Sequence, residues 1–362
     1  MTLDSPAAPS TPADTPSPRR QITIRRPDDW HIHLRDGEIL RKVLPLTAMQ
    51  FARGIVMPNL SPPVTTVEAA LAYRARILAA LPAGADFVPL MTCYLTDTTT
   101  PEEIERGFSE RAWIAAKLYP AGATTNAHHG VTDLNRLAPV LERMERIGMP
   151  LLTHGESTDP TVDIFDREAR FMEESLVPLL ARHQGLKIVA EHVTTAEALD
   201  VVRAHAPRMG ATITPHHLMI NRSAMFQGGL RPHHYCLPVA KREHHRLALR
   251  KAATGGETCF FLGTDTAPHP RRAKEAACGC AGIFHGAIAL QCYAQVFAEE
   301  GALDRLEAFA AFNGARFHGL APNEGSVTLA ELPADPPQPL DLGEDEIVVF
   351  REGETLPWSI LR

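Results

Sequence analysis

Short apolar runs of high β-propensity alternate with longer segments of helical periodicity along most of this 362-residue chain. Such alternation is typical of parallel sheets whose strands are joined by helices. We expect eight strands, at residues 21–33, 54–59, 87–95, 115–120, 150–155, 186–193, 211–216 and 259–265. Amphipathic helices are expected between them at 67–81, 134–147, 165–183, 196–206 and 241–254.

Eight strands with intervening helices over about 250 residues predict an α/β protein with a closed (β/α)8 TIM barrel. An open doubly wound sheet is the alternative, but no glycine-rich loop follows the first strand. Residues 1–20 are rich in Pro, Ser, Thr and Ala, which predicts a disordered tail. The barrel is expected over 21–319, with a C-terminal extension at 320–362 that packs on it and contains a strand-like segment at 347–350.

The composition favours small-molecule chemistry. A net charge of −7 without a block of lysine or arginine argues against a nucleic-acid partner or an acidic membrane surface. The chain shows no signal-peptide core and no apolar run of membrane length, so we expect a cytoplasmic protein. The six cysteines are expected to be free thiols, because Cys278-Gly279-Cys280 lacks a second pair at zinc-finger spacing.

Polar side chains fall repeatedly at the predicted strand ends. His31 and His33 close the first strand and face the same side, because strand side chains alternate. One such pair carries little weight among 17 histidines. Barrel enzymes, however, place their chemistry at the carboxyl ends of the strands. Other strands end near Asn59, Lys117, His154, His192 and Asp265.

Each of these residues has a structural explanation on its own, as a turn former, an interfacial lysine or a hydrogen-bonded core histidine. Together they predict a metal-ligand set. Four histidines and Asp265 exceed the three or four ligands of one zinc, so two metal ions are expected. A bridging anion is then needed, and Lys117 supplies one only when CO₂ has carboxylated its amine. With a hydroxide bridge, the site would favour an anionic substrate.

These residues resemble the amidohydrolase superfamily and, within it, the single-function dihydroorotases of bacteria. The resemblance spans about residues 22–319. Its motifs are Asp29-Trp30-His31-Ile32-His33-Leu34-Arg35-Asp36, Val56-Met57-Pro58-Asn59, Lys117-Leu118-Tyr119-Pro120, His154-Gly155-Glu156, Glu191-His192, Gly263-Thr264-Asp265, Ala267-Pro268-His269 and Cys278-Gly279-Cys280-Ala281-Gly282.

The resemblance implies reversible cyclisation of N-carbamoyl-L-aspartate to L-dihydroorotate in pyrimidine synthesis. It implies a zinc ion on His31, His33 and Asp265, with Asp265 also the general base and acid. A second zinc would be held by His154 and His192, and carboxylated Lys117 and hydroxide would bridge the two. The implied substrate contacts are Arg35, Asn59 and His269 on the carboxylate, the backbone of Leu237 and Ala281 on the ring, and Thr124 and Thr125 on a closing loop.

Arg35 also has an argument of its own. It lies two residues past His33 with the same strand parity, and its planar guanidinium suits a carboxylate. A salt bridge at the barrel rim with Asp36 or Glu38 is the alternative.

Other functions stay open at this point. A hydantoinase or allantoinase would share the metals but would give Arg35, Asn59 and His269 no carboxylate to bind. A catalytically inactive barrel could serve as an assembly subunit, although the complete ligand set argues against it. The oligomeric state is undetermined, with a homodimer as one arrangement. No role is evident for His128, and the pairs 216–217, 233–234 and 244–245 are expected to be structural or surface histidines.

Overall fold

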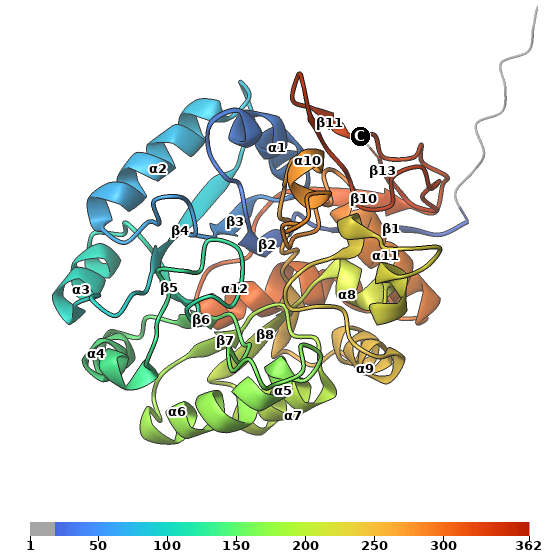
Figure 1. The fold of residues 1–362 in the computed structure, drawn as a ribbon. Coiled ribbons are helices and arrows are strands. Elements are labelled where there is room, and N and C mark those ends of the chain that lie inside the picture. Colours follow the sequence, from blue (N-terminus) through green and yellow to red (C-terminus); the bar gives the residue numbers. More distant parts are fainter. Residues whose placement is uncertain (1–18, 362) are drawn as a thin grey trace, which may run out of the picture.

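The computed structural model describes residues 19–361, so nearly all of the tail expected at 1–20 lies outside the described residues. Eight parallel strands pair in chain order to form a (β/α)8 TIM barrel (Figure 1), which confirms the predicted fold class. The strands are β2 (Asp28–Ile32), β3 (Arg53–Val56), β4 (Val88–Tyr94), β5 (Ala115–Leu118), β6 (Leu151–Thr153), β7 (Ile188–Ala190), β8 (Met209–Ile213) and β9 (Phe260–Leu262).

The barrel closes where its first strand meets the segment after its last. The backbone N–H of Asp265 donates to the carbonyl of His31 over 2.9 Å, and that of His33 donates to the carbonyl of Thr266 over 3.1 Å. Ile32 and Thr266 form a parallel bridge at the same place. Three of the predicted metal ligands therefore lie on the two sides of this closing seam.

Helices ring the barrel (Figure 1). They are α1 (Gly37–Gln50), α2 (Val67–Ala80), α3 (Pro101–Ser109), α4 (Ala138–Ile147), α5 (Arg167–Phe171), α6 (Val177–Arg182), α7 (Ala196–His205), α8 (Pro215–Met219), α9 (Glu243–Thr254), α10 (Arg271–Lys274), α11 (Ala289–Glu299) and α12 (Asn313–His318). Shorter turns are the 3₁₀ segments η1 (Leu134–Leu137), η3 (Arg222–Met225), η4 (Pro232–His234) and η5 (Leu303–Arg305), and the π segments η2 (Met172–Leu176) and η6 (Ala308–Phe312). Side-chain caps fix several starts, because the Thr66 and Thr195 hydroxyls accept from the amides of Ala69 and Ala198.

The helix expected at 165–183 is not uniform. It consists of α5, the π segment η2 and α6, in direct succession. Pro178 stands in the first turn of α6 and lacks the N–H that an unbroken α-helix would use, so the preceding turn widens.

The single strand expected at 21–33 is wrong. β1 (Gln21–Arg25) pairs antiparallel with β10 (Ser326–Ala330), and β10 pairs with β13 (Ser359–Leu361), outside the barrel. Pro27 cannot donate a backbone hydrogen bond and separates β1 from the barrel strand β2. The sequence could not reveal the pairing of β1 with a segment some 300 residues away, since it depends on long-range packing.

The C-terminal segment lies against the barrel. β11 (Leu340–Asp341) and β12 (Glu346–Ile347) form a small hairpin. Of residues 347–350, which were expected to form a strand, only Ile347 belongs to one. The amide of Phe350 donates to the carbonyl of Phe284 over 2.6 Å, and Val349 joins the main hydrophobic core. The division into residues 1–20, 21–319 and 320–362 remains a proposal.

A second apolar cluster fills the barrel beneath the candidate site. It includes Trp30 of β2, Val189 of β7 and Phe261 of β9, together with Phe317 of α12. The helix approaches so closely that a Cβ at Gly314 would lie 2.0 Å from the Trp30 indole nitrogen, which only glycine avoids.

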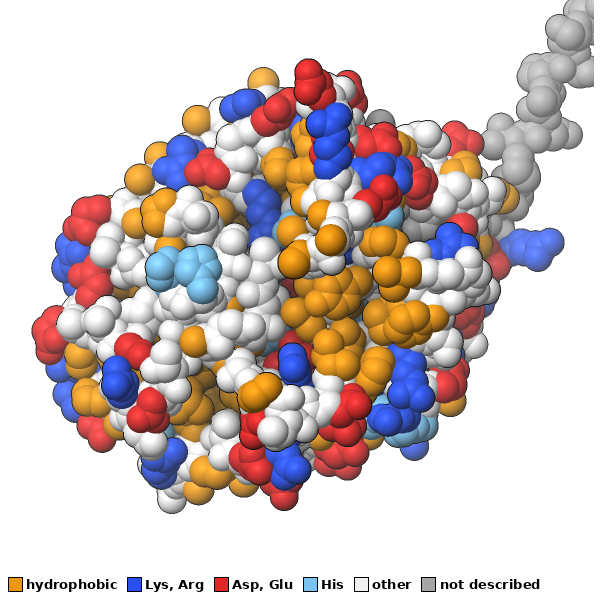
Figure 2. All heavy atoms as spheres, in the orientation of Figure 1, with side chains coloured by type: hydrophobic (Ala, Val, Ile, Leu, Met, Phe, Trp, Pro, Cys, Tyr) orange, Lys and Arg blue, Asp and Glu red, His pale blue; other side chains and the backbone are white. Residues whose placement is uncertain are grey.

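Figure 2 looks onto the face seen in Figure 1. Acidic and basic side chains are interspersed around its periphery, and hydrophobic side chains gather nearer its centre. Across residues 19–361, none of the helices has the length and apolarity to traverse a membrane.

Candidate active site

The six predicted metal ligands meet at one end of the barrel. They follow or end β2, β5, β6, β7 and β9, where the carboxyl ends of parallel strands converge. Each of these residues is at most 8% exposed, and Lys117 is completely buried. The predicted residues are thus brought together, although their roles remain proposals.

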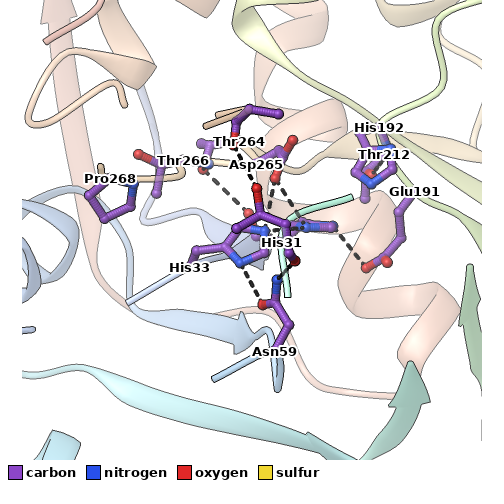
Figure 3. A network of polar contacts seen from close by, with 12 residues as sticks. His31, His33, Asn59, Glu191, His192, Thr212, Thr264, Asp265, Thr266 and Pro268 are labelled. Atoms are coloured by element: carbon purple, nitrogen blue, oxygen red, sulfur yellow. Dashed lines mark hydrogen bonds and ion pairs between the residues drawn. The ribbon is translucent and has the colours of Figure 1, made fainter. Parts of the chain in front are cut away.

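His31, His33 and Asp265 form the tightest group (Figure 3). One carboxylate oxygen of Asp265, Oδ1, lies 3.1 Å from His33 Nε2 and 3.3 Å from His31 Nε2. The two Nε2 atoms are 3.3 Å apart. Three donor atoms that face one another at such distances match the nitrogen and oxygen ligands of a zinc-like ion.

His192 and His154 continue this group. The ring of His192 lies 4.9 Å from that of His31 and 4.8 Å from that of His154, centre to centre. His192 Nδ1 is buried and has no hydrogen-bond partner among the described residues. An unpartnered buried nitrogen is costly unless something else binds it, so this donor set fits a metal. His154 Nε2, by contrast, contacts Glu156 Oε2 at 2.7 Å.

Glu191 is the main site residue that the sequence analysis did not assign. Its carboxylate lies 3.0 Å from His31 Nδ1 and contacts the amine of Lys117. A carboxylate behind a ligating histidine fixes the ring so that the other nitrogen faces the metal. The signal available in the sequence was its place directly before His192, but a glutamate there has many structural explanations.

Burial governs the charge of Lys117. Desolvation lowers its pKa from the ordinary value, although the adjacent Glu191 carboxylate opposes this effect. The amine also lies 4.7 Å from the centre of the Tyr119 ring. A lowered pKa increases the neutral amine, which is the form that reacts with CO₂.

Asn59 determines which nitrogen of His33 carries a proton. The Asn59 amide nitrogen donates to the carbonyl of Thr125 over 3.1 Å, so its Oδ1 faces His33 Nδ1 at 2.9 Å. That oxygen can only accept, which places the proton on Nδ1 and leaves Nε2 free to bind a metal. Burial and the nearby Arg35 guanidinium lower the pKa of His33 to about 4, which keeps the ring neutral.

Asp265 remains an anion in this setting. Burial alone would raise the pKa of its carboxyl group, but the charge of the adjacent His31 holds that pKa well below the usual range. An ionised Asp265 can accept a proton during a reaction.

Arg35 reaches the site by an unexpected backbone route. The strand-parity argument is wrong, because β2 ends at Ile32 and Arg35 has φ 57°. Its guanidinium nevertheless donates to His269 Nε2 over 3.0 Å. The alternative rim salt bridge is not formed by Asp36, which pairs with Arg76 instead. Burial and Arg35 lower the pKa of His269 to about 2, so that ring is neutral and can accept.

Left-handed backbone recurs at the site. His192 has φ 41° and Asp265 has φ 47°, values that non-glycine residues rarely adopt. Such strain is found where the surrounding structure holds a functional side chain in place. The surroundings include the Thr212 hydroxyl, which accepts from the amide of His192 over 2.7 Å, and Glu168, which accepts from the amides and hydroxyls of Thr194 and Thr195.

A second buried acid supports the seam. Asp29 accepts from the hydroxyl and amide of Thr264, at 2.6 Å and 2.9 Å, and from the amide of His31 at 3.1 Å. Burial raises its pKa to about 7 despite these bonds. Asp29 thus ties the strand that carries His31 to the segment that carries Asp265.

The predicted substrate residues surround one small cavity above the metal ligands. Its lining includes Arg35, Asn59, Thr124, Thr125, Leu237 and Ala281. His269 lines an adjoining hollow that also contains Arg35, Asn59 and Thr125. The positively charged Arg35 guanidinium therefore borders both the cavity and the adjoining hollow.

The remaining histidine pairs and cysteines lie mostly outside this cavity. His216 and His217 are buried near it, with His216 Nδ1 3.1 Å from His285 Nε2 and His217 bonded to Thr214 and Pro238. His233 pairs with Glu275 at the surface. All six cysteines are free, as expected.

Comparison with known proteins decides the family. Residues 28–329 match the Amidohydrolase family. A dihydroorotase from Novosphingobium aromaticivorans is 60% identical over 339 residues, 94% of this chain and 98% of that protein. The chain belongs to the dihydroorotases of the amidohydrolase family. A dihydroorotase from Yersinia enterocolitica is 56% identical, over 94% of the enzyme and 97% of that relative.

Solved structures agree with this assignment. The enzyme matches a Campylobacter jejuni dihydroorotase with a TM-score of 0.87 and 32% identity, over 96% of its own chain and 99% of the other. A Saccharomyces cerevisiae dihydroorotase, crystallised with 5-fluoroorotic acid, also gives 0.87, with 30% identity over 94% and 98% of the two chains.

More distant structures share the fold alone. An L-hydantoinase from Arthrobacter aurescens is 16% identical, with a TM-score of 0.76 over 94% of the enzyme and 83% of that chain. An inactive dihydroorotase-like domain from Chaetomium thermophilum is 14% identical, with a TM-score of 0.62 over 94% and 91%.

Proposed function

We propose that the enzyme catalyses the reversible cyclisation of N-carbamoyl-L-aspartate to L-dihydroorotate at a site with two zinc ions. The observation that carries this proposal is the convergence of His31, His33, His192 and Asp265 beside the Arg35–His269 pair. Ligands for cations and a receptor for a carboxylate then open into the same cavity. A hydantoinase would leave Arg35 without an anionic partner.

The residues present would hold two ions in the manner that the family resemblance implies. His31, His33 and Asp265 would bind one, His154 and His192 the other, and carboxylated Lys117 with a hydroxide would lie between them. His154 would exchange its contact with Glu156 for the ion. Bound zinc would supply Lewis-acid activation of water and of the amide carbonyl.

Asp265 would perform the proton transfers. In the hydrolytic direction it accepts the proton of the attacking water and delivers it to the leaving ring nitrogen. In the synthetic direction it takes the proton from the carbamoyl nitrogen and returns it to the departing water. Its carboxylate lies beside both His31 and His33.

Arg35, Asn59 and His269 would bind the substrate carboxylate, and Thr124 and Thr125 would close over it. The backbone of Leu237 and Ala281 would face the pyrimidine ring. His269 would accept a hydrogen bond from the Arg35 guanidinium and so orient it. Because His269 is neutral, it would not compete with the substrate carboxylate for the positive charge of Arg35.

The direct test assays purified enzyme with carbamoyl aspartate and with dihydroorotate. We expect turnover in both directions. A preparation with full metal content that converts hydantoin or allantoin but neither of these compounds would contradict the proposal.

Metal analysis of the same preparation provides a further prediction. Because the ligand set exceeds the needs of one ion, about two zinc ions per chain are expected. Removal by a chelator should abolish turnover, and re-addition of zinc should restore it. A fully active preparation with a single ion per chain would contradict the binuclear site.

Arg35→Met should weaken substrate binding far more than metal binding. The carboxylate would lose its charged partner, at a cost of roughly 2 to 5 kcal/mol in kcat/KM. Kinetics and zinc content of the variant provide the measurement. Unchanged KM and kcat would mean that Arg35 does not contact the substrate.

A further inference from the structure

The loop at residues 121–130 is attached to the site by a pair of asparagines. Asn126 donates its side-chain amide to the backbone carbonyl of Asn59 over 3.0 Å. Asn59 in turn donates its own amide to the backbone carbonyl of Thr125 over 3.1 Å. Two reciprocal hydrogen bonds therefore join the loop after β5 to the segment that follows β3.

The backbone of Asn126 is also held in place. It has φ 56°, the left-handed conformation in which asparagine is tolerated better than most residues. The buried Tyr94 of β4 donates its hydroxyl to the carbonyl of Asn126 over 3.1 Å. Both the side chain and the backbone of this one residue are thus fixed to the barrel.

Asn59 connects the loop to His33. Asn59 Oδ1 contacts His33 Nδ1, as Figure 3 shows, while the other end of the same amide holds Thr125. The Thr125 hydroxyl lies 3.4 Å from the carbonyl of Ala281, across the cavity. The loop therefore spans the cavity between Asn59 and Ala281.

We propose that Asn126 is a positioning residue, which holds Thr124 and Thr125 over the bound substrate through its bonds to Asn59 and Tyr94. This inference rests on the proposed function. Asn126 itself does not line the inner cavity, and it acts through the two threonines that do. Closure of such a loop excludes water and completes the site.

Asn126→Gly is the decisive variant, because glycine keeps the left-handed backbone and removes the side-chain amide. Loss of one hydrogen bond should reduce kcat/KM about 5- to 10-fold, with zinc content unchanged. Asn126→Ala should have a larger effect, since it adds backbone strain. Tyr94→Phe, which removes only the hydroxyl, should change kcat/KM in the same direction.

Hydrogen exchange separates positioning from a general loss of stability. In Asn126→Gly, peptides that cover residues 121–130 should exchange faster, while peptides from β6 and β7 should exchange as in the wild type. His128→Ala is the matched control, because His128 is exposed on the same loop and packs on the ring of His129. It should leave kinetics and exchange unchanged.

The outcomes distinguish the two proposals. A wild type that does not interconvert carbamoyl aspartate and dihydroorotate would refute the proposed function. An active wild type whose Asn126→Gly variant keeps normal kcat, KM and loop exchange would refute the positioning role alone. Faster exchange throughout the barrel would likewise refute it, since the residue would then act on stability.

Discussion

Lys117→Ala is expected to abolish nearly all turnover and to reduce the amount of zinc that the enzyme retains. The alanine variant has no amine for CO₂ to carboxylate, so no bridging anion would join the two ligand groups. Steady-state assays and metal analysis provide the measurements. The expectation depends on the buried position of Lys117, where an unmodified ammonium beside two dications would be strongly unfavourable.

Chemical rescue makes this prediction specific. A small added carboxylic acid should partly restore the alanine variant by occupying the vacated space. Lys117→Met is the matched control, because methionine fills the same space and should resist rescue. The native mass of the metal-loaded wild type should include one added carbon dioxide, and an active enzyme with a bare amine would contradict the carbamate whatever the variants do.

Asp265→Asn is expected to lower kcat by about 10²- to 10⁴-fold, the range typical of a general acid–base group. Asparagine keeps the shape of the side chain but cannot carry the proton between water and the ring nitrogen. Substrate affinity should change much less than kcat. Stopped-flow or steady-state assays in both directions would measure the effect.

Metal content must accompany that assay, because Asp265 Oδ1 also faces His31 and His33. Asp200→Asn, on the outer surface of α7, is a suitable control and should be as active as the wild type. An Asp265→Asn variant within tenfold of the wild-type kcat, with zinc retained, would remove this residue from the proton transfer.

Local pattern predicted the barrel strands and the residues at their ends. Short apolar runs of high β-propensity are visible in a single sequence, and parallel strands must end on the same side of a barrel. That rule alone predicts that His154 and Lys117 lie at the same end of the barrel. The residue types at the strand ends also indicated a metal site, because their side chains are chemically distinctive metal ligands.

The missed features depend on contacts between distant segments. Glu191 is one acid among 43 acidic residues, and nothing local marks the one that faces both His31 and Lys117. Pro27 separates β1 from β2, but this boundary can be recognised only once β1 is seen to pair with β10. The argument from strand parity failed at Arg35, because side chains alternate between the two faces only while the chain stays extended and the chain turns at Arg35.

The closing seam has a consequence for how the enzyme is assembled. Its backbone bonds join His31 to Asp265 and His33 to Thr266, pairs more than 230 residues apart in the chain. Contacts of such separation carry a loop-closure entropy cost and are associated with slow folding. The metal ligands on the two sides cannot meet until the first and last barrel strands have joined. The free energy of metal binding should then stabilise the closed barrel against opening. A chain that lacks either the first or the last barrel strand would not gain this stabilisation.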